Sequence, residues 1–474
     1  MAVPFILDRS GPDPLHRQIY EQWRLGILAG RFQPRQRVPS TRGFATAYNV
    51  SRTTVSAAYE QLIAEGYFEA ATGSGTFVCS ELPDRTMRPP AALRRMPPQA
   101  SRISGFARRL DTDPRVSPTV SGRLDLSRLG PDLERFPFAL WRRLLTRHLR
   151  RLSPAHFDHF AAPGGTEALR RQIAAYVARA RAVHCTPEQV VVVSGSQQGL
   201  DLCARVLLDP GDEALVEEPG YAGIRYLLSA HGAVTVPMPV LPDGASVRGI
   251  SRIPRVLYVT PSHQFPTGVS MSLARRLELL DWARHHRVLI LEDDYDSEYR
   301  YSGAPLPAMQ SLAGDVPVVY LGTFSNVMFP GLRIGYLVLP EDLVAPFTRA
   351  KWLTDRYTPV LEQAALADFL GEGHLDRHIR RMRRIYKVRR DVLVSALARA
   401  FGDDVTIVGD AAGMHLTARF RGRTPAARAE RQGVQLRSTA SYYLAQPPAN
   451  EFLFGFAAVG ERTIREAVRR LSDR

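Results

Sequence analysis

Apolar residues near the N-terminus recur every three or four positions, which is the spacing of one face of an α-helix. The first such run starts after Pro14, a residue tolerated in a first helical turn, and stops at Gly30. Shorter runs with the same spacing cover residues 41–47 and 52–65. These patterns predict three helices ahead of residue 66.

Two short apolar runs follow, over residues 67–70 and 76–78, with a glycine-rich turn between them. They predict a β-hairpin. Ser51 stands directly before the third helix, where its hydroxyl can cap the free backbone N–H groups. Three helices and a hairpin form a winged helix-turn-helix, whose third helix reaches base edges in the major groove. Residues 1–79 are therefore predicted to bind double-stranded DNA.

The rest of the chain divides into a linker and a large domain. Residues 80–122 contain repeated proline and scattered arginine without a sustained period, which predicts a linker. From residue 123 to 474, strand-like apolar runs alternate with helical patterns, as in an α/β domain with a mostly parallel sheet. Several of these runs end in polar residues, and ligands bind at the carboxyl ends of strands in such sheets.

Charge and cysteine content indicate the kind of partner and the cellular compartment to expect. The net charge of +15 suits an anionic partner, although all but two of the 62 basic residues are arginines, so the bias is partly compositional. Residues 1–79 hold eight arginines against six acidic residues, so specific DNA binding is expected to need two copies, as in a homodimer. Three cysteines without metal-site spacing predict a cytoplasmic protein with no metal. No apolar run approaches a membrane span.

Residues 322–340, GTFSNVMFPGLRIGYLVLP, lie between two apolar strands and carry groups suited to a phosphate, namely Thr323, Ser325 and Arg333. The stretch resembles the cofactor-lysine segment of fold-type I pyridoxal-phosphate (PLP) enzymes, S-K-x-x-x-P-x-L-R-x-G-Y. Asn326 stands at the place of the lysine. An amide nitrogen is not a nucleophile, so it cannot form a Schiff base. The segment therefore has the frame of a PLP site without the group that binds the aldehyde.

Residues 38–78 resemble the GntR family of bacterial regulators over their whole length. Guanidinium and hydroxyl groups, helix N-terminal amides and a glycine suit contacts with phosphates and bases. Taken singly, Ser51 could serve only as a cap and Arg42 only as a solvated charge. The resemblance implies DNA contacts at Arg42, Ser51, Arg52, Thr53, Thr54 and Gly75.

The order of winged helix, linker and aminotransferase-like domain resembles the MocR family of transcription regulators. The resemblance implies the aminotransferase fold type I with a small C-terminal α/β subdomain. It places Tyr221 on the pyridine ring, Asp293 at the ring nitrogen, Tyr295 at the phenolic oxygen, and His263 at the ring edge with Gln264. The residues that it assigns to the phosphate are Gly195, Ser196, Gln197, Ser325 and Arg333.

We therefore expect a regulator that senses PLP, or its adduct with an amino compound, without a covalent Schiff base. Phe265 precedes Pro266 where enzymes of the fold usually have asparagine, which favours a regulator. A working PLP-dependent aminotransferase, weakened by Asn326, and a regulator with an effector other than PLP remain alternatives. Lys351 and Lys387 are expected to be charges on helix surfaces.

Two further arginine features of the C-terminal part have their own expectations. The arginine-rich residues 373–386 are predicted to form a solvated helix face. The strand at residues 452–457, where aminotransferases often place an arginine for the substrate carboxylate, is apolar, and Arg437 is the nearest alternative.

Overall fold

The protein divides into two compact units, residues 1–102 and residues 103–474. The computed structural model describes residues 5–71, 73–82, 101–110, 124–151, 163–303, 306–422 and 425–472.

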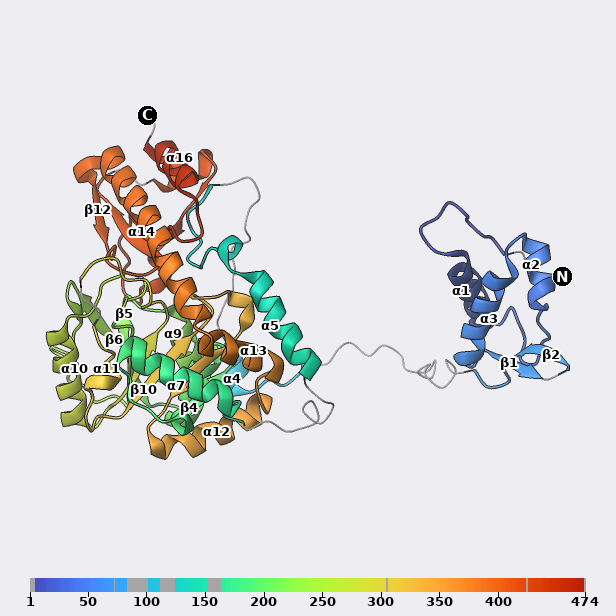
Figure 1. The fold of residues 1–474 in the computed structure, drawn as a ribbon, viewed down its shortest axis with the longest axis horizontal. Coiled ribbons are helices and arrows are strands. Elements are labelled where there is room, and N and C mark those ends of the chain that lie inside the picture. The colour runs from blue at the N-terminus through green and yellow to red at the C-terminus, as the bar shows by residue number, and fades with distance from the viewer. Residues whose placement is uncertain are drawn as a thin grey trace. The chain divides into compact units, whose positions relative to one another are not determined.

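The N-terminal unit is the predicted winged helix-turn-helix (Figure 1). β1 and β2 pair antiparallel, with Phe68 opposite Val78 and Ala71 opposite Gly75. The helix boundaries agree with the sequence pattern to within one residue or two. The elements are α1 (Leu15–Leu28), α2 (Thr41–Tyr48), α3 (Arg52–Ala64), β1 (Phe68–Ala71) and β2 (Gly75–Val78).

Aromatic rings form much of the core of this unit. The Trp23 ring lies 4.3 Å from the ring of Phe32 and 5.3 Å from that of Phe68, so α1 is packed against the hairpin. Asn49 adopts a left-handed conformation with φ 51° and ends α2. The Ser51 hydroxyl then accepts a 3.0 Å hydrogen bond from the Thr54 N–H and starts α3. These two local signals set the turn between the second and third helices.

Part of the predicted linker packs on the large unit. Residues 83–100 and 111–122 of that linker lie outside the described residues. The short helix α4 (Gly105–Arg108) contacts α9 (Ala222–His231), where the Phe106 ring lies 5.2 Å from the ring of His231. Arg109 Nε donates to the backbone oxygens of Ser229 and Ala230 at 3.2 and 3.1 Å. The large unit thus begins ahead of the alternating strands and helices.

An eight-stranded sheet forms the centre of the large unit and has the mostly parallel order expected from the sequence. Only β11 and β7 run against the others, because both pair antiparallel with their neighbours. The strands, in spatial order, are β4 (Val190–Val193), β11 (Gly335–Val338), β10 (Val318–Thr323), β9 (Leu289–Asp294), β8 (Val256–Val259), β5 (Glu213–Glu218), β6 (Val234–Leu241) and β7 (Gly244–Ala245).

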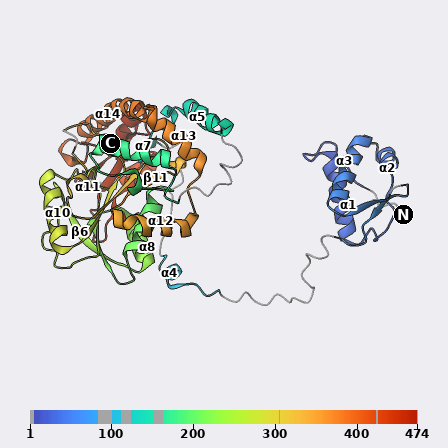
Figure 2. The same cartoon turned by 60° about the horizontal axis from the view of Figure 1, so that its bottom comes forward.

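Helices cover both faces of this sheet (Figure 2). Val190 and Val192 of β4 pack with α7 (Glu167–Arg181) and α13 (Val360–Gly371). Val191 and Val193 point to the other face, as successive strand residues must. The other helices on the first face are α10 (Leu273–His286) and α11 (Met309–Leu312), and those on the second are α8 (Ser196–Leu207), α9 and α12 (Glu341–Asp355).

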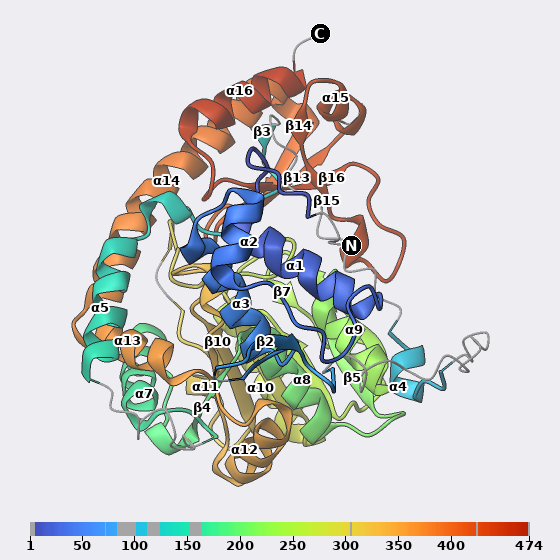
Figure 3. The same ribbon diagram turned by 90° about the vertical axis from the view of Figure 1, so that its right-hand side faces the viewer.

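The C-terminal part forms the expected small α/β subdomain (Figure 3). Its four-stranded antiparallel sheet is covered by α14, and α16 packs beside α14. The elements of this part are α14 (His374–Phe401), β12 (Val405–Val408), β13 (His415–Phe420), α15 (Ala426–Arg431), β15 (Arg437–Ser438), β16 (Glu451–Gly455) and α16 (Glu461–Ser472), together with the pair β3 (Leu124–Asp125) and β14 (Val434–Gln435). The helix α5 (Phe138–Arg151) packs instead on α13, where the Trp141 ring lies 6.1 Å from the ring of Phe369. Within the described ranges, no helix combines the length and apolar character that crossing a membrane requires.

A buried ion pair ties α14 to the segment before α5. Arg389 Nη2 donates to Asp132 Oδ2 at 2.9 Å, and the two side chains are only 6% and 9% exposed. Arg389 also donates to the backbone oxygen of Ala457, and the Asp132 N–H donates to the Tyr386 hydroxyl at 2.9 Å. These contacts join three segments that are far apart in the sequence.

We predict that Arg389→Met lowers the free energy of unfolding by about 3 kcal/mol, because it removes the buried cation of Asp132 and leaves the carboxylate only the more exposed Arg135, whose Nε lies 3.4 Å from Asp132 Oδ2. Urea denaturation followed by circular dichroism measures the change. Arg384→Met, an exposed position on the same helix, is the control and should change stability by less than about 0.5 kcal/mol. Equal stability of the two variants would contradict the importance of this pair.

Candidate functional site

A cavity of about 320 Å³ lies at the carboxyl ends of β8, β9 and β10, where the sequence predicts ligand binding. Residues from several distant segments meet there. Its lining residues are Leu129, Gly130, Ser196, Tyr221, Tyr258, Thr260, Phe265, Asp293, Tyr295, Thr323, Ser325, Asn326, Arg333 and His415.

Asp293, at the end of β9, presents a buried carboxylate to this cavity. Its Oδ2 accepts a 2.7 Å hydrogen bond from the Tyr258 hydroxyl, whereas its Oδ1 has no partner. Burial raises the pKa of Asp293 to about 7. A buried carboxylate oxygen without a partner is costly, and a protonated ring nitrogen would satisfy it. This side chain therefore fits the pyridine ring of PLP.

The opposite part of the cavity has the features of a phosphate site. Gly195, with φ 86°, precedes Ser196 at the N-terminus of α8, where backbone N–H groups are free for an anion. A Cβ at Gly195 would lie 2.6 Å from Arg333 Nη2, so glycine permits the guanidinium to approach this turn. Arg333 donates to the Ser194 backbone oxygen at 2.9 Å, and the buried Ser325 hydroxyl has no partner. These groups fit a phosphate.

Asn326 lines the cavity, and its amide is already engaged: Nδ2 donates to the Tyr295 backbone oxygen at 2.9 Å. Neither lysine of the chain is among the lining residues. Lys387 is an exposed charge of α14 and pairs with Asp391 at 2.9 Å, as expected. The expectation for Lys351 is wrong, because its side chain is 0% exposed and Nζ contacts Asp355 Oδ1 at 2.8 Å.

The burial of Lys351 has a structural cause. Asp355, its partner at the end of α12, also accepts a 2.7 Å hydrogen bond from Gln198 Nε2 of α8. The ammonium is therefore held where α12 packs against α8. This network lies next to the β4–α8 turn, but the Lys351 amine is not part of the cavity lining.

The predicted ring contacts are only partly gathered around the cavity. Tyr221 lines it and donates from its hydroxyl to Gln197 Oε1 at 3.1 Å, so Gln197 stands behind Tyr221. Gln264, predicted at the ring edge, instead donates to Glu217 Oε2 and the Pro219 backbone oxygen at 3.1 and 2.8 Å. His263 is buried beneath the cavity rather than in its lining.

His263, Asp296 and His415 form a buried cluster whose donor atoms lie within 4.8 Å of one another. His263 Nδ1 lies 2.9 Å from Asp296 Oδ2 and 3.1 Å from the Tyr295 hydroxyl. Burial holds the pKa of His415 well below its usual value, so this imidazole is neutral. Two imidazoles and a carboxylate could hold a metal ion. They also position Tyr295 without one, through the His263 contact.

Several lining residues were not predicted from the sequence. Tyr258 lies near the end of β8 and Thr260 directly follows that strand, so their position at a strand end was a usable signal. His415 of β13 and residues 129–130 lie far from the other motifs in the chain and carry no local signal. Long-range packing alone brings them to the cavity.

The candidate DNA-binding residues lie at the turn between α2 and α3 and at the hairpin. Arg42, Arg52 and Thr53 are exposed, while Ser51 and Thr54 hydrogen-bond to each other as the cap of α3. Gly75 opens β2 with φ 110°, and a Cβ there would lie 3.3 Å from Arg37 Nε. Arg37 is thus an additional exposed cation beside the hairpin, which the sequence pattern did not single out.

Comparison with known proteins gives matches for both units. Residues 141–471 match the aminotransferase class I and II family, and residues 15–78 match the gntR family of bacterial regulatory proteins. The chain is 41% identical to the probable rhizopine catabolism regulatory protein MocR of Rhizobium meliloti, over 98% of this chain and 94% of that protein.

Two further similarities concern the cofactor. The chain is 31% identical, over 99% of its length and 98% of the other, to the pyridoxine biosynthesis transcriptional regulator PdxR of Corynebacterium glutamicum. The crystal structure of LysN, an α-aminoadipate aminotransferase from Thermus thermophilus complexed with N-(5'-phosphopyridoxyl)-L-leucine, matches with a TM-score of 0.71 and 27% identity, over 78% of this chain and 96% of that one. The chain therefore belongs to the MocR family of transcription regulators, with a gntR-type DNA-binding domain ahead of an aminotransferase class I and II domain.

Proposed function

We propose that this regulator binds operator DNA as a homodimer and that its aminotransferase-like domain senses PLP, or the adduct of PLP with an amino compound, without a covalent link to the chain. The observation that carries the proposal is the cavity itself. A buried carboxylate oxygen without a partner and a phosphate cradle face one space, and Asn326 stands where an amine would be needed.

Electrostatics supports a ring with a protonated nitrogen. Asp293 Oδ1 has no donor, and Tyr258 supplies only one hydrogen bond to the other oxygen. When bound, PLP supplies an aldehyde and an electron-withdrawing ring. The chain would orient that ring through Asp293 and Tyr221 and hold the phosphate at Ser196, Ser325 and Arg333.

The absence of a suitable amine supports reversible binding. Asn326 donates its amide to Tyr295, and an amide does not add to an aldehyde. Lys351 is buried in its pair with Asp355, and Lys387 lies on the surface of α14. The affinity for PLP would then depend on hydrogen bonds and ring stacking. Because these interactions are not covalent, the ligand would dissociate on dilution.

The amino-compound half of the effector would lie near Phe265. The Tyr442 ring is 4.9 Å from the ring of Phe265, and Arg437 Nη1 donates to the Tyr442 hydroxyl at 3.4 Å. Exposed Arg437 is thus available to an anionic group of the amino compound. The ligand in the LysN structure, in which an amino acid is joined to the phosphopyridoxyl group, has this composition.

We predict that the affinity for PLP falls as the pH is lowered through about 7. Asp293 takes up a proton in that range and loses the negative charge that attracts the ring nitrogen. Asp293→Asn should remove this step and weaken binding about 10- to 100-fold. Equilibrium dialysis with the full-length protein between pH 6 and pH 8 measures both effects. Asp281→Asn, an exposed carboxylate of α10, is the matched control, and an unchanged pH step in Asp293→Asn would refute the role of Asp293.

The second prediction concerns covalent chemistry. After incubation with PLP and reduction with borohydride, the wild-type protein should carry no cofactor adduct on Lys351 or Lys387, as read by peptide mass spectrometry. Asn326→Lys should form an adduct at residue 326, because the surrounding groups already orient the aldehyde, whereas Asn326→Gln should not. A wild-type adduct on either lysine would overturn reversible binding, and an unreactive Asn326→Lys would show that the cavity does not hold the cofactor in this pose.

The third prediction tests the DNA-binding face. Arg52→Ala should weaken binding to a DNA fragment selected in vitro with the full-length protein by about tenfold, because Arg52 opens the exposed N-terminus of α3. A mobility-shift titration at fixed salt measures the change. Arg17→Ala, an exposed arginine of α1, is the control for lost charge. If both variants bind as the wild type does, α3 is not the recognition helix.

A further inference from the structure

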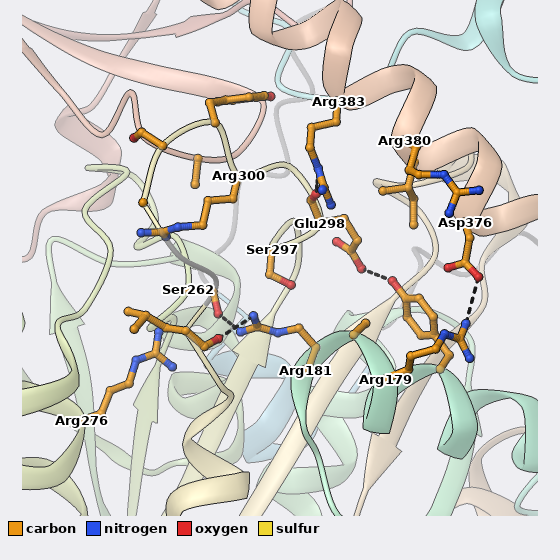
Figure 4. A pocket seen from close by; sticks show the side chains of 18 residues that line it. Arg179, Arg181, Ser262, Arg276, Ser297, Glu298, Arg300, Asp376, Arg380 and Arg383 are labelled. Carbon is orange, nitrogen blue, oxygen red and sulfur yellow. Dashed lines mark hydrogen bonds and ion pairs between the residues drawn. The ribbon is translucent and has the colours of Figure 1, made fainter.

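A second and larger cavity, of about 560 Å³, lies between α7, the loop after β9 and α14. It is distinct from the candidate cofactor site, with which it shares no lining residue. Figure 4 shows Arg380 and Arg383 on α14 above, and Arg179 and Arg181 on α7 below, with Ser297 and Glu298 between them and the Arg181 side chain directed toward Ser262. Six arginines and two carboxylates line this space. The lining arginines are Arg179, Arg181, Arg276, Arg300, Arg380 and Arg383.

Three of these arginines are neutralised by the chain itself. Arg181 Nε contacts Asp294 Oδ2 at 2.6 Å, and Arg179 Nη2 contacts Asp376 Oδ2 at 3.0 Å. Arg276 donates to three backbone oxygens and lies 3.9 Å from Glu292. Their positive charges therefore serve mainly to hold the fold.

The other three arginines are not neutralised in this way. Within the described part of the chain, Arg300, Arg380 and Arg383 form no ion pair. Arg300 donates to the Ser270 hydroxyl at 3.3 Å, but its buried Nε has no partner. Arg383 donates to the Glu298 backbone oxygen at 2.9 Å.

The remaining carboxylate contributes little negative charge. Glu298 accepts a 2.6 Å hydrogen bond from the Tyr176 hydroxyl, and burial raises the pKa of Glu298 to about 7. At neutral pH the carboxyl is partly protonated. The cavity therefore carries an excess of positive charge from guanidiniums on two different elements, the loop after β9 and α14. The arginines of residues 373–386 are exposed as predicted, but part of that face borders a cavity.

We propose that this cavity binds a small anion of the phosphate class with at least two negative charges, such as a diphosphate or a phosphate ester. Guanidinium groups bind phosphate oxygens through paired hydrogen bonds. The volume matches that of ordinary small-molecule sites. An extended DNA strand would meet the exposed Arg380 and Arg383 but not the buried Arg300 Nε, which favours a small ligand. A bound anion would join α14 to the loop that follows Asp293 and Tyr295.

Isothermal titration of the full-length protein with pyrophosphate tests this site. The wild type should show saturable binding, and Arg300→Gln/Arg380→Gln should bind at least about tenfold more weakly, because each lost guanidinium removes charge-assisted hydrogen bonds. The control Arg349→Gln/Arg431→Gln removes the same charge at exposed positions elsewhere and should bind as the wild type does. If the double variant is unstable, Arg380→Gln alone can be used, because it changes only an exposed side chain. This single variant should also weaken pyrophosphate binding.

Two further measurements distinguish pyrophosphate binding in this cavity from binding at other anion sites. Arg333→Gln disables the phosphate cradle of the cofactor cavity and should leave pyrophosphate binding intact. Loss of binding in Arg333→Gln, with retention in Arg300→Gln/Arg380→Gln, would place the anion in that cradle and overturn the proposal. Absence of pyrophosphate binding to the wild type, or a loss confined to DNA binding in Arg300→Gln/Arg380→Gln, would overturn it as well. A melting temperature that pyrophosphate raises in the wild type but not in the double variant would support it.

Discussion

Three consecutive buried carboxylates, Glu292, Asp293 and Asp294, at the carboxyl end of β9 constrain the arrangement of the large unit. Buried charges need partners, and strand side chains alternate between faces. Glu292 and Asp294 therefore face one side, where Arg276 of α10 and Arg181 of α7 approach them. Burial alone would raise the pKa of Asp294, but the charge of Arg181 and hydrogen bonds from Tyr320, Ser297 and Arg181 together outweigh burial, and the pKa is lowered. The helices on that face are thus held by electrostatics as well as by apolar packing.

Asp293 points to the other side and has no cation. Its unpaired oxygen faces the cavity at the strand ends, whereas on the opposite side Arg300 and two arginines of α14, Arg380 and Arg383, form no ion pair within the described residues. One short strand end thus separates a carboxylate without a cation from a group of guanidiniums without carboxylates. Each of these charges is of the kind that an external ligand of opposite sign would neutralise.

Much of this was predictable from local patterns. The helix and hairpin boundaries of residues 1–79 follow from apolar spacing and from signals such as Ser51, and strand-end positions correctly brought Ser196, Asp293 and Ser325 together. The surface position expected of Lys351 was wrong, because a helical period identifies an apolar face but not a lysine that meets a carboxylate at a helix–helix contact. Gln264 was predicted at the ring edge but instead donates to Glu217. The two residues are 47 positions apart in the sequence, so no local pattern indicates this contact.

The sequence by itself determined the two units, the sheet class, the asparagine at position 326 and the polar strand ends, because each depends on residue type or on short-range periodicity. Only the tertiary structure decided which charged side chains are left without a partner of opposite charge. His415 enters the cavity that contains Asp293 from β13, and Arg383 reaches the arginine-lined cavity from α14. Whether a carboxylate or a guanidinium keeps an open hydrogen-bonding position depends on every segment packed around it, and no single stretch of sequence contains that information.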